Sequence, residues 1–382
     1  MSEPAASEAF GTAFDRAMMR RCLELARRAL EQTAPNPLVG AVVVREGTIV
    51  GEGFHAGAGR PHAEANALQA AGERARGATL YVNLEPCNRH SRTPPCSEAL
   101  IAAGIARVAI GMRDPNPEAT GGIERLQAAG IEVSIGIEAA ACQRLNEAFT
   151  HRVRHQRPFG VLKYAMTLDG KIATATGHSQ WVTGSNARHA VHRERAACDA
   201  VIVGGDTVRQ DDPQLTSHGT GRREPLRVVM SRTLDLPADA RLWQVTQAPT
   251  LVLTERGADP ARIRQLRDRG VEAIALPALT PAAAMAELYQ RQLNRVLWEC
   301  GGRLAARAIA QGGVQKLMAF IAPKLIGDGG APSPVGDLGI ATLQQAQMLT
   351  DVSWRAIAPD YLVEGYLAAS DTAPGAEPPW QP

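Results

Sequence analysis

The sequence predicts an α/β protein made of two consecutive domains, and three observations support this fold class. The chain has 382 residues, a length typical of two or three domains. Short apolar runs of strand length alternate with amphipathic segments of helical period through both halves of the chain. A polar and basic stretch at residues 151–158 interrupts this alternation, and we place a linker there.

The first domain, residues 1–150, is expected to form a three-layer sandwich in which helices cover both faces of a sheet. A first helix is expected at 14–31, where Met18, Cys22 and Leu25 fall on one face. Apolar residues 39–44 and 48–51 flank the turn Arg45-Glu46-Gly47, which predicts a hairpin. The elements expected next are a helix at 62–71, a strand at 79–82, a helix after Pro94-Pro95 that ends near 103, a strand at 108–110, a helix at 122–129, a strand at 131–133 and a helix at 138–149.

The second domain, residues 159–368, repeats the alternation and is expected to contain a mostly parallel sheet. Strands are expected at 160–165, 200–204, 226–230, 249–253, 271–275, 295–299 and 315–321. Helices are expected at 186–196, 259–269, 281–290 and 303–310. Residues 369–382 contain Pro-Gly-Ala-Glu-Pro-Pro and are expected to be a disordered tail.

Composition argues against several classes of function. The formal net charge is +2, and acidic and basic residues are mixed along the chain, so no nucleic-acid partner is expected. No apolar run approaches the length of a membrane span, and residues 1–10 lack the features of a secretory signal. The six cysteines are scattered rather than arranged as a disulfide framework. We therefore expect a cytoplasmic protein with no membrane partner.

One imidazole, one carboxylate and two thiols occur in the order of a catalytic zinc site. His62-Ala63-Glu64 is followed by Pro86-Cys87 and then by Pro95-Cys96. A catalytic zinc takes three protein ligands and leaves one position for water. We expect His62, Cys87 and Cys96 to bind Zn²⁺ and Glu64 to be the catalytic proton carrier. The alternative is a closed structural site, for which His90 is the candidate fourth ligand.

These residues belong to a longer pattern that resembles the deaminase half of the bifunctional riboflavin-biosynthesis deaminase/reductase family. The matching segments are Asn36-Pro37-Leu38-Val39-Gly40, Glu85-Pro86-Cys87, Arg92-Thr93-Pro94-Pro95-Cys96 and Asp114-Pro115-Asn116-Pro117. The resemblance implies a cytidine-deaminase-like fold and hydrolytic removal of the 2-amino group from 2,5-diamino-6-(5-phosphoribosylamino)pyrimidin-4(3H)-one. We expect Asn36 and His90 to contact this small phosphoribosyl-pyrimidine. The loop Asn88-Arg89-His90-Ser91 departs from the Ser-His-His-Gly usual in the family, which affects the expected substrate contacts.

The second domain resembles the reductase half of the same family. The matching segments are 162–173, 179–184, 199–204, 207–216, 299–304 and 322–327, in the family's order and over nearly the whole domain. The resemblance implies a dihydrofolate-reductase-like fold and NADPH as cofactor. The implied reaction reduces the ribosyl group of 5-amino-6-(5-phosphoribosylamino)uracil to a ribityl group.

The resemblance also implies roles for individual residues of the second domain. Those expected to face NADPH are Ala165, Trp181, Thr207, Asp211, Gly301, Gly302, Arg303 and Leu304. Those expected to face the substrate are Lys163, Ser179, Arg195, Leu215, His218 and Glu299. The residue types suit this chemistry, because glycines between a strand and a helix let backbone N–H groups approach a phosphate.

Two positions of the second domain depart from the family's pattern. His218 stands where the family usually has arginine, and Ser231 where it usually has aspartate. A histidine attracts a phosphate more weakly than an arginine, and in a pH-dependent way. The leading hypothesis is a bifunctional enzyme, and the alternative is a deaminase with a weakened or inactive reductase domain. A structural zinc protein is a third hypothesis, against which Glu64 argues. A homo-oligomer is expected from the family alone.

Overall fold

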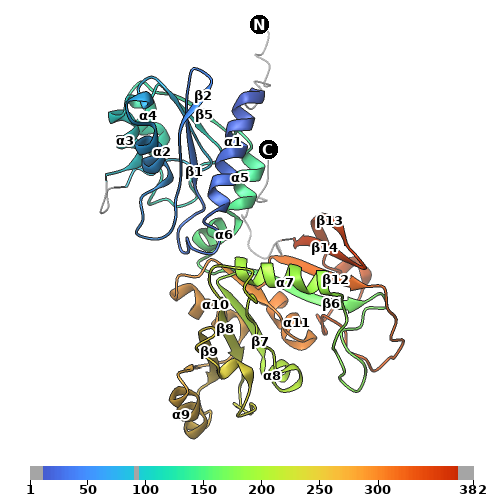
Figure 1. The fold of residues 1–382 in the computed structure, drawn as a ribbon. Coiled ribbons are helices and arrows are strands. Elements are labelled where there is room, and N and C mark those ends of the chain that lie inside the picture. The colour runs from blue at the N-terminus through green and yellow to red at the C-terminus, as the bar shows by residue number, and fades with distance from the viewer. Residues whose placement is uncertain (1–11, 90–93, 369–382) are drawn as a thin grey trace. The chain divides into compact units, whose positions relative to one another are not determined.

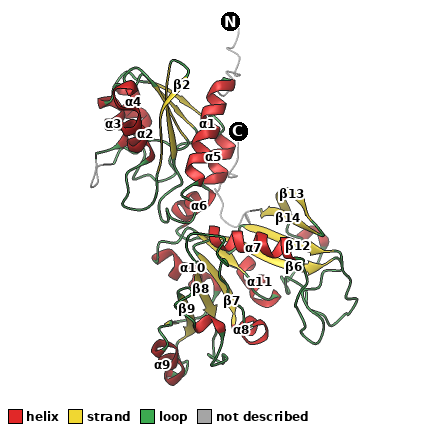
Figure 2. Ribbon diagram, viewed as in Figure 1, coloured by secondary structure: helices red, strands yellow, loops and turns green. Residues whose placement is uncertain are grey.

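The computed structural model describes residues 12–89 and 94–368, and the chain divides into two compact units. The first unit covers Met1–Gln156 and the second Arg157–Pro382. Each unit has its own sheet, and strands alternate with helices in both (Figures 1 and 2). The tail expected at 369–382 lies outside the described residues. Among the described helices, none has the length and apolar character needed to cross a bilayer.

The first unit is a five-stranded sheet between two layers of helices. Its strands are β1 (Gly40–Arg45), β2 (Thr48–Phe54), β3 (Thr79–Val82), β4 (Arg107–Ile110) and β5 (Glu132–Ile135). Their order is β2-β1-β3-β4-β5, with β1 antiparallel to both neighbours and β3, β4 and β5 parallel. Helices α1 (Ala13–Arg27) and α5 (Ala139–Leu145) cover one face, while α2 (Ala63–Ala71), α3 (Cys96–Ala102) and α4 (Gly122–Ala128) cover the other (Figure 1). The three-layer arrangement expected from the sequence is confirmed.

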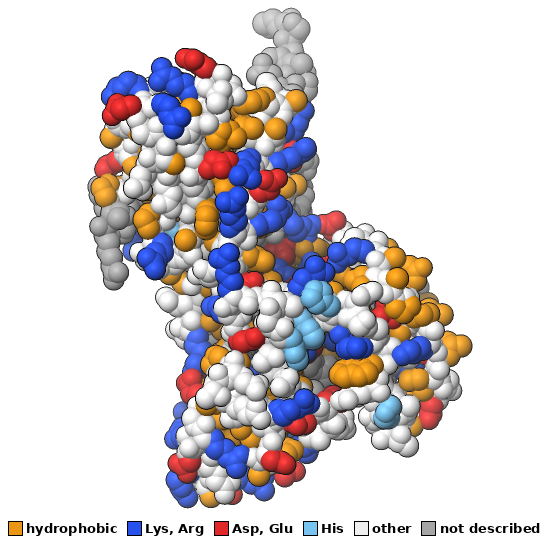
Figure 3. Space-filling view, in the orientation of Figure 1, with side chains coloured by type: hydrophobic (Ala, Val, Ile, Leu, Met, Phe, Trp, Pro, Cys, Tyr) orange, Lys and Arg blue, Asp and Glu red, His pale blue; other side chains and the backbone are white. Residues whose placement is uncertain are grey.

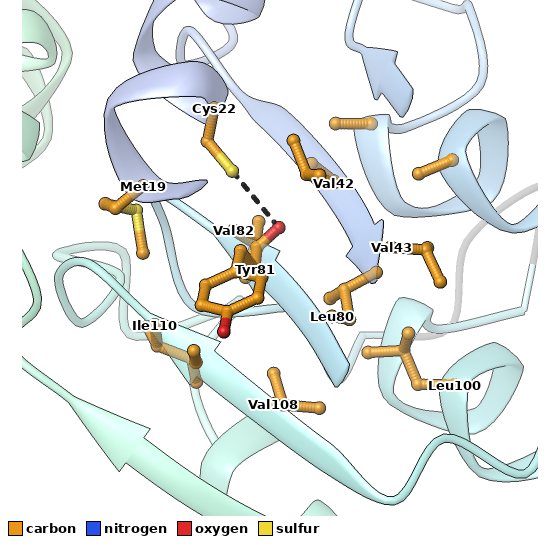
Figure 4. Packing of buried hydrophobic residues seen from close by; sticks show 14 of the residues in the cluster. Met19, Cys22, Val42, Val43, Leu80, Tyr81, Val82, Leu100, Val108 and Ile110 are labelled. Atoms are coloured by element: carbon orange, nitrogen blue, oxygen red, sulfur yellow. Dashed lines mark hydrogen bonds between the residues drawn. The ribbon is translucent and has the colours of Figure 1, made fainter. Parts of the chain in front are cut away.

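The core of the first unit holds both helical layers tightly against the sheet. Figure 4 shows Met19 and Cys22 of α1 beside Tyr81 of β3, and the Cys22 thiol donates a hydrogen bond of 3.3 Å to the Tyr81 carbonyl oxygen. On the other face, α2 approaches β2 so closely that a Cβ at Gly53 would lie 2.4 Å from the carbonyl oxygen of Ala63. This contact fixes the first turn of α2, where Glu64 lies.

The second unit contains a nine-stranded sheet in the order β10-β9-β8-β7-β11-β6-β12-β14-β13. Its strands are β6 (Phe159–Thr167), β7 (Ala200–Gly204), β8 (Leu226–Met230), β9 (Thr250–Glu255), β10 (Glu272–Leu276), β11 (Arg295–Trp298), β12 (Lys316–Ala322), β13 (Leu349–Ile357) and β14 (Asp360–Leu367). The strands from β10 to β12 are parallel, and β14 and β13 add an antiparallel edge. The helices are α7 (Ser185–Ala197), α8 (Gly205–Asp211), α9 (Pro260–Asp268), α10 (Pro281–Gln290) and α11 (Gly302–Ala310). The mostly parallel sheet agrees with the expectation.

The hairpin of β13 and β14 and the helix α8 were not expected from the sequence. Nearly every side chain of β13 is exposed, so the strand lacks the alternation of buried and exposed residues that marks a half-buried strand. Several large apolar side chains are exposed in this region, including Met348 and Trp354. Figure 3 shows hydrophobic side chains gathered on this part of the second unit. Elsewhere on the face shown in Figure 3, acidic and basic side chains are interspersed, as the mixed sequence suggested.

Helix α6 (Glu147–His155) extends into the stretch where the sequence suggested a linker. Phe149 is buried, whereas the other residues of α6 are partly or fully exposed, which gives the segment its polar composition. Only residues 156–158 lie between α6 and β6. The single helix expected at 138–149 is instead divided into α5 and α6 at Asn146.

Buried Asn146 connects this break to the start of the sheet. Its Oδ1 accepts a hydrogen bond of 2.8 Å from the backbone N–H of Leu38, and its Nδ2 donates one of 3.0 Å to the Leu38 carbonyl oxygen. The side chain is 2% exposed, so water cannot replace these bonds without opening the packing. Asn146 therefore fixes the chain just before β1.

We predict that Asn146→Ala lowers the free energy of unfolding by about 1–3 kcal/mol, because the partly buried Leu38 N–H loses its partner. The measurement is urea unfolding followed by circular dichroism. Gln127→Ala, a change at an exposed position of α4, is the matched control and should be close to neutral. Equal stability of the two variants would contradict the role of Asn146.

Candidate active sites

The first candidate site forms where two helices begin on the same face of the first sheet. His62 is the residue that precedes the first turn of α2, and Glu64 lies in that turn. Cys96 is the first residue of α3, directly after Pro95, a residue type that is favoured at helix starts. Cys87 lies in the loop that follows β3. His62, Glu64 and Cys96 thus reach one place because α2 and α3 begin there, and the loop after β3 adds Cys87.

The three expected ligands converge as one metal site requires. The ligand atoms of His62, Cys87 and Cys96 all lie within 4.8 Å of one another. Nδ1 of His62 is 3.2 Å from Sγ of Cys96 and 3.5 Å from Sγ of Cys87. Zinc bonds of about 2.0–2.3 Å in a tetrahedron place ligand atoms about 3.6 Å apart. The donor set therefore fits Zn²⁺ in both residue type and spacing.

The electrostatics of this site also favour a cation. A hydrogen bond with the Cys96 thiol lowers the pKa of Cys87 to about 4, and a further hydrogen bond with His62 acts in the same direction. Conversely, the hydrogen bond to Cys87, together with burial, raises the pKa of Cys96 far above its usual value. Two thiolates at this separation need a positive charge between them, which Zn²⁺ would supply.

Glu64 is a buried acid beside these ligands. Its side chain is 3% exposed, and burial raises its pKa to about 7. A carboxyl group with a pKa near neutral can both accept and release a proton at physiological pH. The structure thus places an acid with suitable properties next to the three ligands.

Glu85 is a supporting residue whose role sequence reasoning missed. Its buried carboxylate accepts hydrogen bonds from the backbone N–H groups of Asp114, Gly121 and Ile123, at 3.1–3.3 Å. These bonds tie the segment before Cys87 to the start of α4. The available sequence signal was an acid directly before Pro86 and the expected ligand Cys87. The three residues whose N–H groups bind Glu85 lie 29 to 38 positions later, so the sequence alone did not reveal the contacts.

The residues expected to contact the first substrate are only partly described. Asn36 lies in the loop before β1, and its Nδ2 is 3.0 Å from Nε2 of His55. The His55 ring in turn makes an edge contact with His62, with ring centroids 5.4 Å apart. This chain of contacts connects Asn36 to the metal ligands. His90 lies outside the described residues.

A second candidate site is a cavity of about 1160 Å³ in the second unit. Its walls come from β6 and the loop that follows it, α7, α8, the start of α11, and the loops that follow α8, β8, β11 and β12. All the residues expected to face NADPH or the second substrate line this cavity: Lys163, Ala165, Ser179, Trp181, Arg195, Thr207, Asp211, Leu215, His218, Glu299, Gly301, Gly302, Arg303 and Leu304. The structure therefore brings together residues that are spread over 142 positions of the sequence.

Three charged residues whose side chains are only 9–18% exposed form one wall of this cavity. Nε of Arg195 is 2.5 Å from Oε1 of Glu299, and Nζ of Lys163 is 3.6 Å from Oε2 of the same carboxylate. Burial alone would raise the pKa of Glu299, but the charges of Arg195 and Lys163 lower it to about 2. Burial lowers the pKa of Lys163. Glu299 thus remains a carboxylate that holds two cations at fixed positions.

Backbone N–H groups at two helix starts also face the cavity. Gly204 precedes α8, Gly301 precedes α11, and neither helix start has a side-chain cap. A Cβ at Gly301 would meet nothing within 4 Å, so this end of α11 is open. Trp181, which also lines the cavity, is 63% exposed, and its ring centroid lies 4.6 Å from the guanidinium carbon of Arg188. A polar helix terminus and an exposed indole suit a nucleotide cofactor.

The two departures from the family pattern lie in or beside this cavity. His218 stacks on His192 of α7, with ring centroids 4.1 Å apart. Ser231 is buried at the end of β8, near the start of α8. His192 was not singled out by sequence reasoning, because nothing in its local sequence marks it as part of a site.

Comparisons with known proteins identify a domain of known type in each unit. Residues 12–112 match the cytidine and deoxycytidylate deaminase zinc-binding region, and residues 158–363 match the RibD C-terminal domain. The chain is 60% identical to riboflavin biosynthesis protein RibD of Synechocystis sp., over 94% of this chain and 97% of that protein. It is 41% identical to RibD of Aquifex aeolicus, over 87% of this chain and 92% of that protein.

Solved structures show the same two-part fold. A diaminohydroxyphosphoribosylaminopyrimidine deaminase/5-amino-6-(5-phosphoribosylamino)uracil reductase from Thermotoga maritima matches with a TM-score of 0.81 and 35% identity, covering 93% of this chain and 99% of that chain. RibD of Acinetobacter baumannii matches with a TM-score of 0.82 and 36% identity at the same coverage. The deaminase-like and reductase-like folds expected from the sequence are therefore confirmed. The chain belongs to the RibD family of riboflavin biosynthesis proteins, with an N-terminal deaminase domain and a C-terminal reductase domain.

Proposed function

We propose that this chain catalyses two consecutive reactions on phosphoribosyl-pyrimidines. The first is the zinc-dependent hydrolytic deamination of 2,5-diamino-6-(5-phosphoribosylamino)pyrimidin-4(3H)-one. The second is the NADPH-dependent reduction of 5-amino-6-(5-phosphoribosylamino)uracil, which converts its ribosyl group to ribityl. The observation that carries this proposal is the convergence of His62, Cys87 and Cys96 beside buried Glu64, in a chain that also has the reductase cavity.

In the deaminase site, His62, Cys87 and Cys96 would hold the zinc ion. When bound, zinc acidifies the attacking water and thereby generates the nucleophile. Glu64 takes the proton of that water on a carboxylate oxygen and delivers it to the leaving amine. Burial disfavours its ionised form, which helps it to release the proton again after accepting it. Asn36 and His90 are proposed to contact the pyrimidine.

In the reductase site, NADPH supplies the hydride, and the chain orients the cofactor and the sugar. Ala165, Trp181, Thr207, Asp211 and the segment Gly301 to Leu304 are proposed to hold NADPH. The proposed substrate residues are Lys163, Ser179, Arg195, Leu215, His218 and Glu299. The Arg195–Glu299 ion pair supports this assignment, because it fixes charged groups inside the cavity where a phosphorylated sugar would bind.

The proposal includes the setting of the enzyme. Its partners would be these small molecules, and the family allows a homo-oligomer. None of the six cysteines forms a disulfide, which suits the reducing cytoplasm. The alternative of a deaminase with an inactive reductase domain receives no support, because the cavity and its charged wall are complete in the described residues.

Purified zinc-loaded protein supplied with the diaminopyrimidine ribotide tests the proposal. We expect ammonia release without NADPH, and NADPH oxidation only after deamination. Ammonia release without any NADPH oxidation would leave the deaminase alone. Absence of both reactions with zinc bound would contradict the proposed function.

We predict that Glu64→Gln lowers the deaminase kcat by about 10²–10⁴-fold, because glutamine cannot accept or donate the proton. NADPH oxidation with the uracil ribotide should not change. Ammonia release measures the first activity, and atomic absorption should show unchanged zinc content. Glu73→Gln, at an exposed position of the first unit, is the matched control. A deaminase rate within tenfold of the wild type would refute the role of Glu64.

We predict that His218→Arg lowers the KM of the reductase for the uracil ribotide about tenfold at pH 8. Burial, followed by the charge of Arg195, lowers the pKa of His218, so its imidazole is neutral at this pH. Arginine stays charged and can pair with a phosphate. Because the pKa of His218 is lowered from the usual histidine value of about 6.5, its imidazole gains a proton only as the pH falls below that value, and the difference should shrink there.

Steady-state NADPH oxidation between pH 5.5 and 8.5 measures this effect. His189→Arg, at an exposed position of the same helix as His192, is the control for added surface charge. An unchanged KM for the ribotide, or an equal effect of both substitutions, would sink this idea.

A further inference from the structure

His55 is a buried histidine beside the deaminase site that has no role in the proposed chemistry. It follows β2 directly, and its backbone N–H donates a hydrogen bond of 2.9 Å to the carbonyl oxygen of Val39. The residue is 3% exposed. Its two ring nitrogens have different neighbours, namely the carbonyl of Pro61 and the carboxamide of Asn36.

The contact with Pro61 fixes which nitrogen of His55 carries the proton. Nδ1 lies 3.1 Å from the Pro61 carbonyl oxygen, which can only accept a hydrogen bond. Nδ1 must therefore be the N–H donor. On the other side of the ring, Nε2 faces the carboxamide nitrogen of Asn36, which can only donate a hydrogen bond. Nε2 must therefore be the acceptor, so the single ring proton lies on Nδ1.

The tautomer of His55 then sets the orientation of the Asn36 carboxamide. Nε2 lies 3.0 Å from the carboxamide nitrogen of Asn36, which donates to it. The opposite orientation would place the carbonyl oxygen Oδ1 against the Nε2 lone pair, and two acceptors repel. The backbone of Asn36 is held by a 2.7 Å bond from its N–H to the Thr33 carbonyl oxygen. Oδ1 is therefore directed away from His55 as an acceptor.

We propose that His55 is a positioning residue that makes Asn36 present a hydrogen-bond acceptor to the pyrimidine of the deaminase site. This inference rests on the proposed function, in which Asn36 contacts the substrate. An acceptor at this place selects rings that carry an amino or N–H donor on the facing edge. A pyrimidine with a carbonyl oxygen at that edge would be rejected, because two acceptors would meet in a desolvated site.

Two substitutions separate the two hydrogen bonds of His55. Glutamine at position 55 can place its Oε1 near the position of Nε2 and accept from Asn36, but it cannot reach Pro61 as Nδ1 does. Asparagine at position 55 can place its amide near the position of Nδ1 and donate to Pro61, but it is too short to reach Asn36. If orientation of Asn36 matters, His55→Gln should preserve substrate binding and His55→Asn should not.

The experiment measures deaminase kcat and KM for the diaminopyrimidine ribotide in the zinc-loaded full-length protein. We expect His55→Asn to raise KM about five- to tenfold with kcat within about twofold, the loss typical of one hydrogen bond. His55→Gln should stay within about twofold of the wild type in both constants. In an Asn36→Ala background, His55→Asn should have no further effect, because the group it orients is absent.

Three outcomes would overturn the proposal. The first is an equal change of KM in His55→Gln and His55→Asn. The second is a further rise of KM when His55→Asn is added to Asn36→Ala. The third is a loss of zinc from His55→Asn, which would mean that His55 supports the ligand His62 instead. The ¹⁵N chemical shifts of the imidazole give a readout without activity, and they should show Nδ1 protonated and Nε2 unprotonated. If the wild type has no deaminase activity, the proposed function fails. The ¹⁵N shifts of the His55 ring, compared between the wild type and Asn36→Ala, then still test the orientation of Asn36.

Discussion

The crowding of two thiols and one imidazole at the start of α2 and α3 is the constraint on which the first active site depends. Their ligand atoms lie within 4.8 Å of one another, so the ionisation of Cys87 suppresses that of Cys96. A divalent cation removes this conflict, and its binding energy becomes part of the stability of the fold. Two residues of the surrounding structure hold the ligands in place. Gly53 lacks a side chain, so α2 can pack closely against β2, and Glu85 fixes the segment before Cys87.

In the second unit, like charges are also balanced by an opposite charge, but here side chains supply both signs. Glu299 is largely shielded from water, and it stays ionised because Arg195 and Lys163 lie within 4 Å of its carboxylate. The charged groups come from β6, α7 and the end of β11, so they meet only when the parallel sheet is formed. In both units, therefore, the site depends on charge compensation between elements that are distant in sequence.

The sequence was sufficient where the signal is local. Alternating apolar runs indicated the α/β fold, and residue types in a fixed order indicated the zinc ligands, which the structure brings together. The break at Asn146 was not predicted, because it depends on hydrogen bonds to Leu38, more than a hundred positions earlier. The edge strand β13 was missed because its side chains are exposed on both faces. The contacts of His55 with Asn36 and Pro61 are visible only in the fold.

X-ray absorption at the zinc edge of the purified protein tests the central claim most directly. Our account predicts one zinc per chain bound by two sulfur atoms at about 2.3 Å and two nitrogen or oxygen atoms at about 2.0–2.2 Å, of which one belongs to His62 and one to exchangeable water. Titration with a small anion should alter the nitrogen and oxygen shell while the sulfur shell persists. A closed shell of four protein ligands, or a protein that folds fully without retaining zinc, would contradict the account.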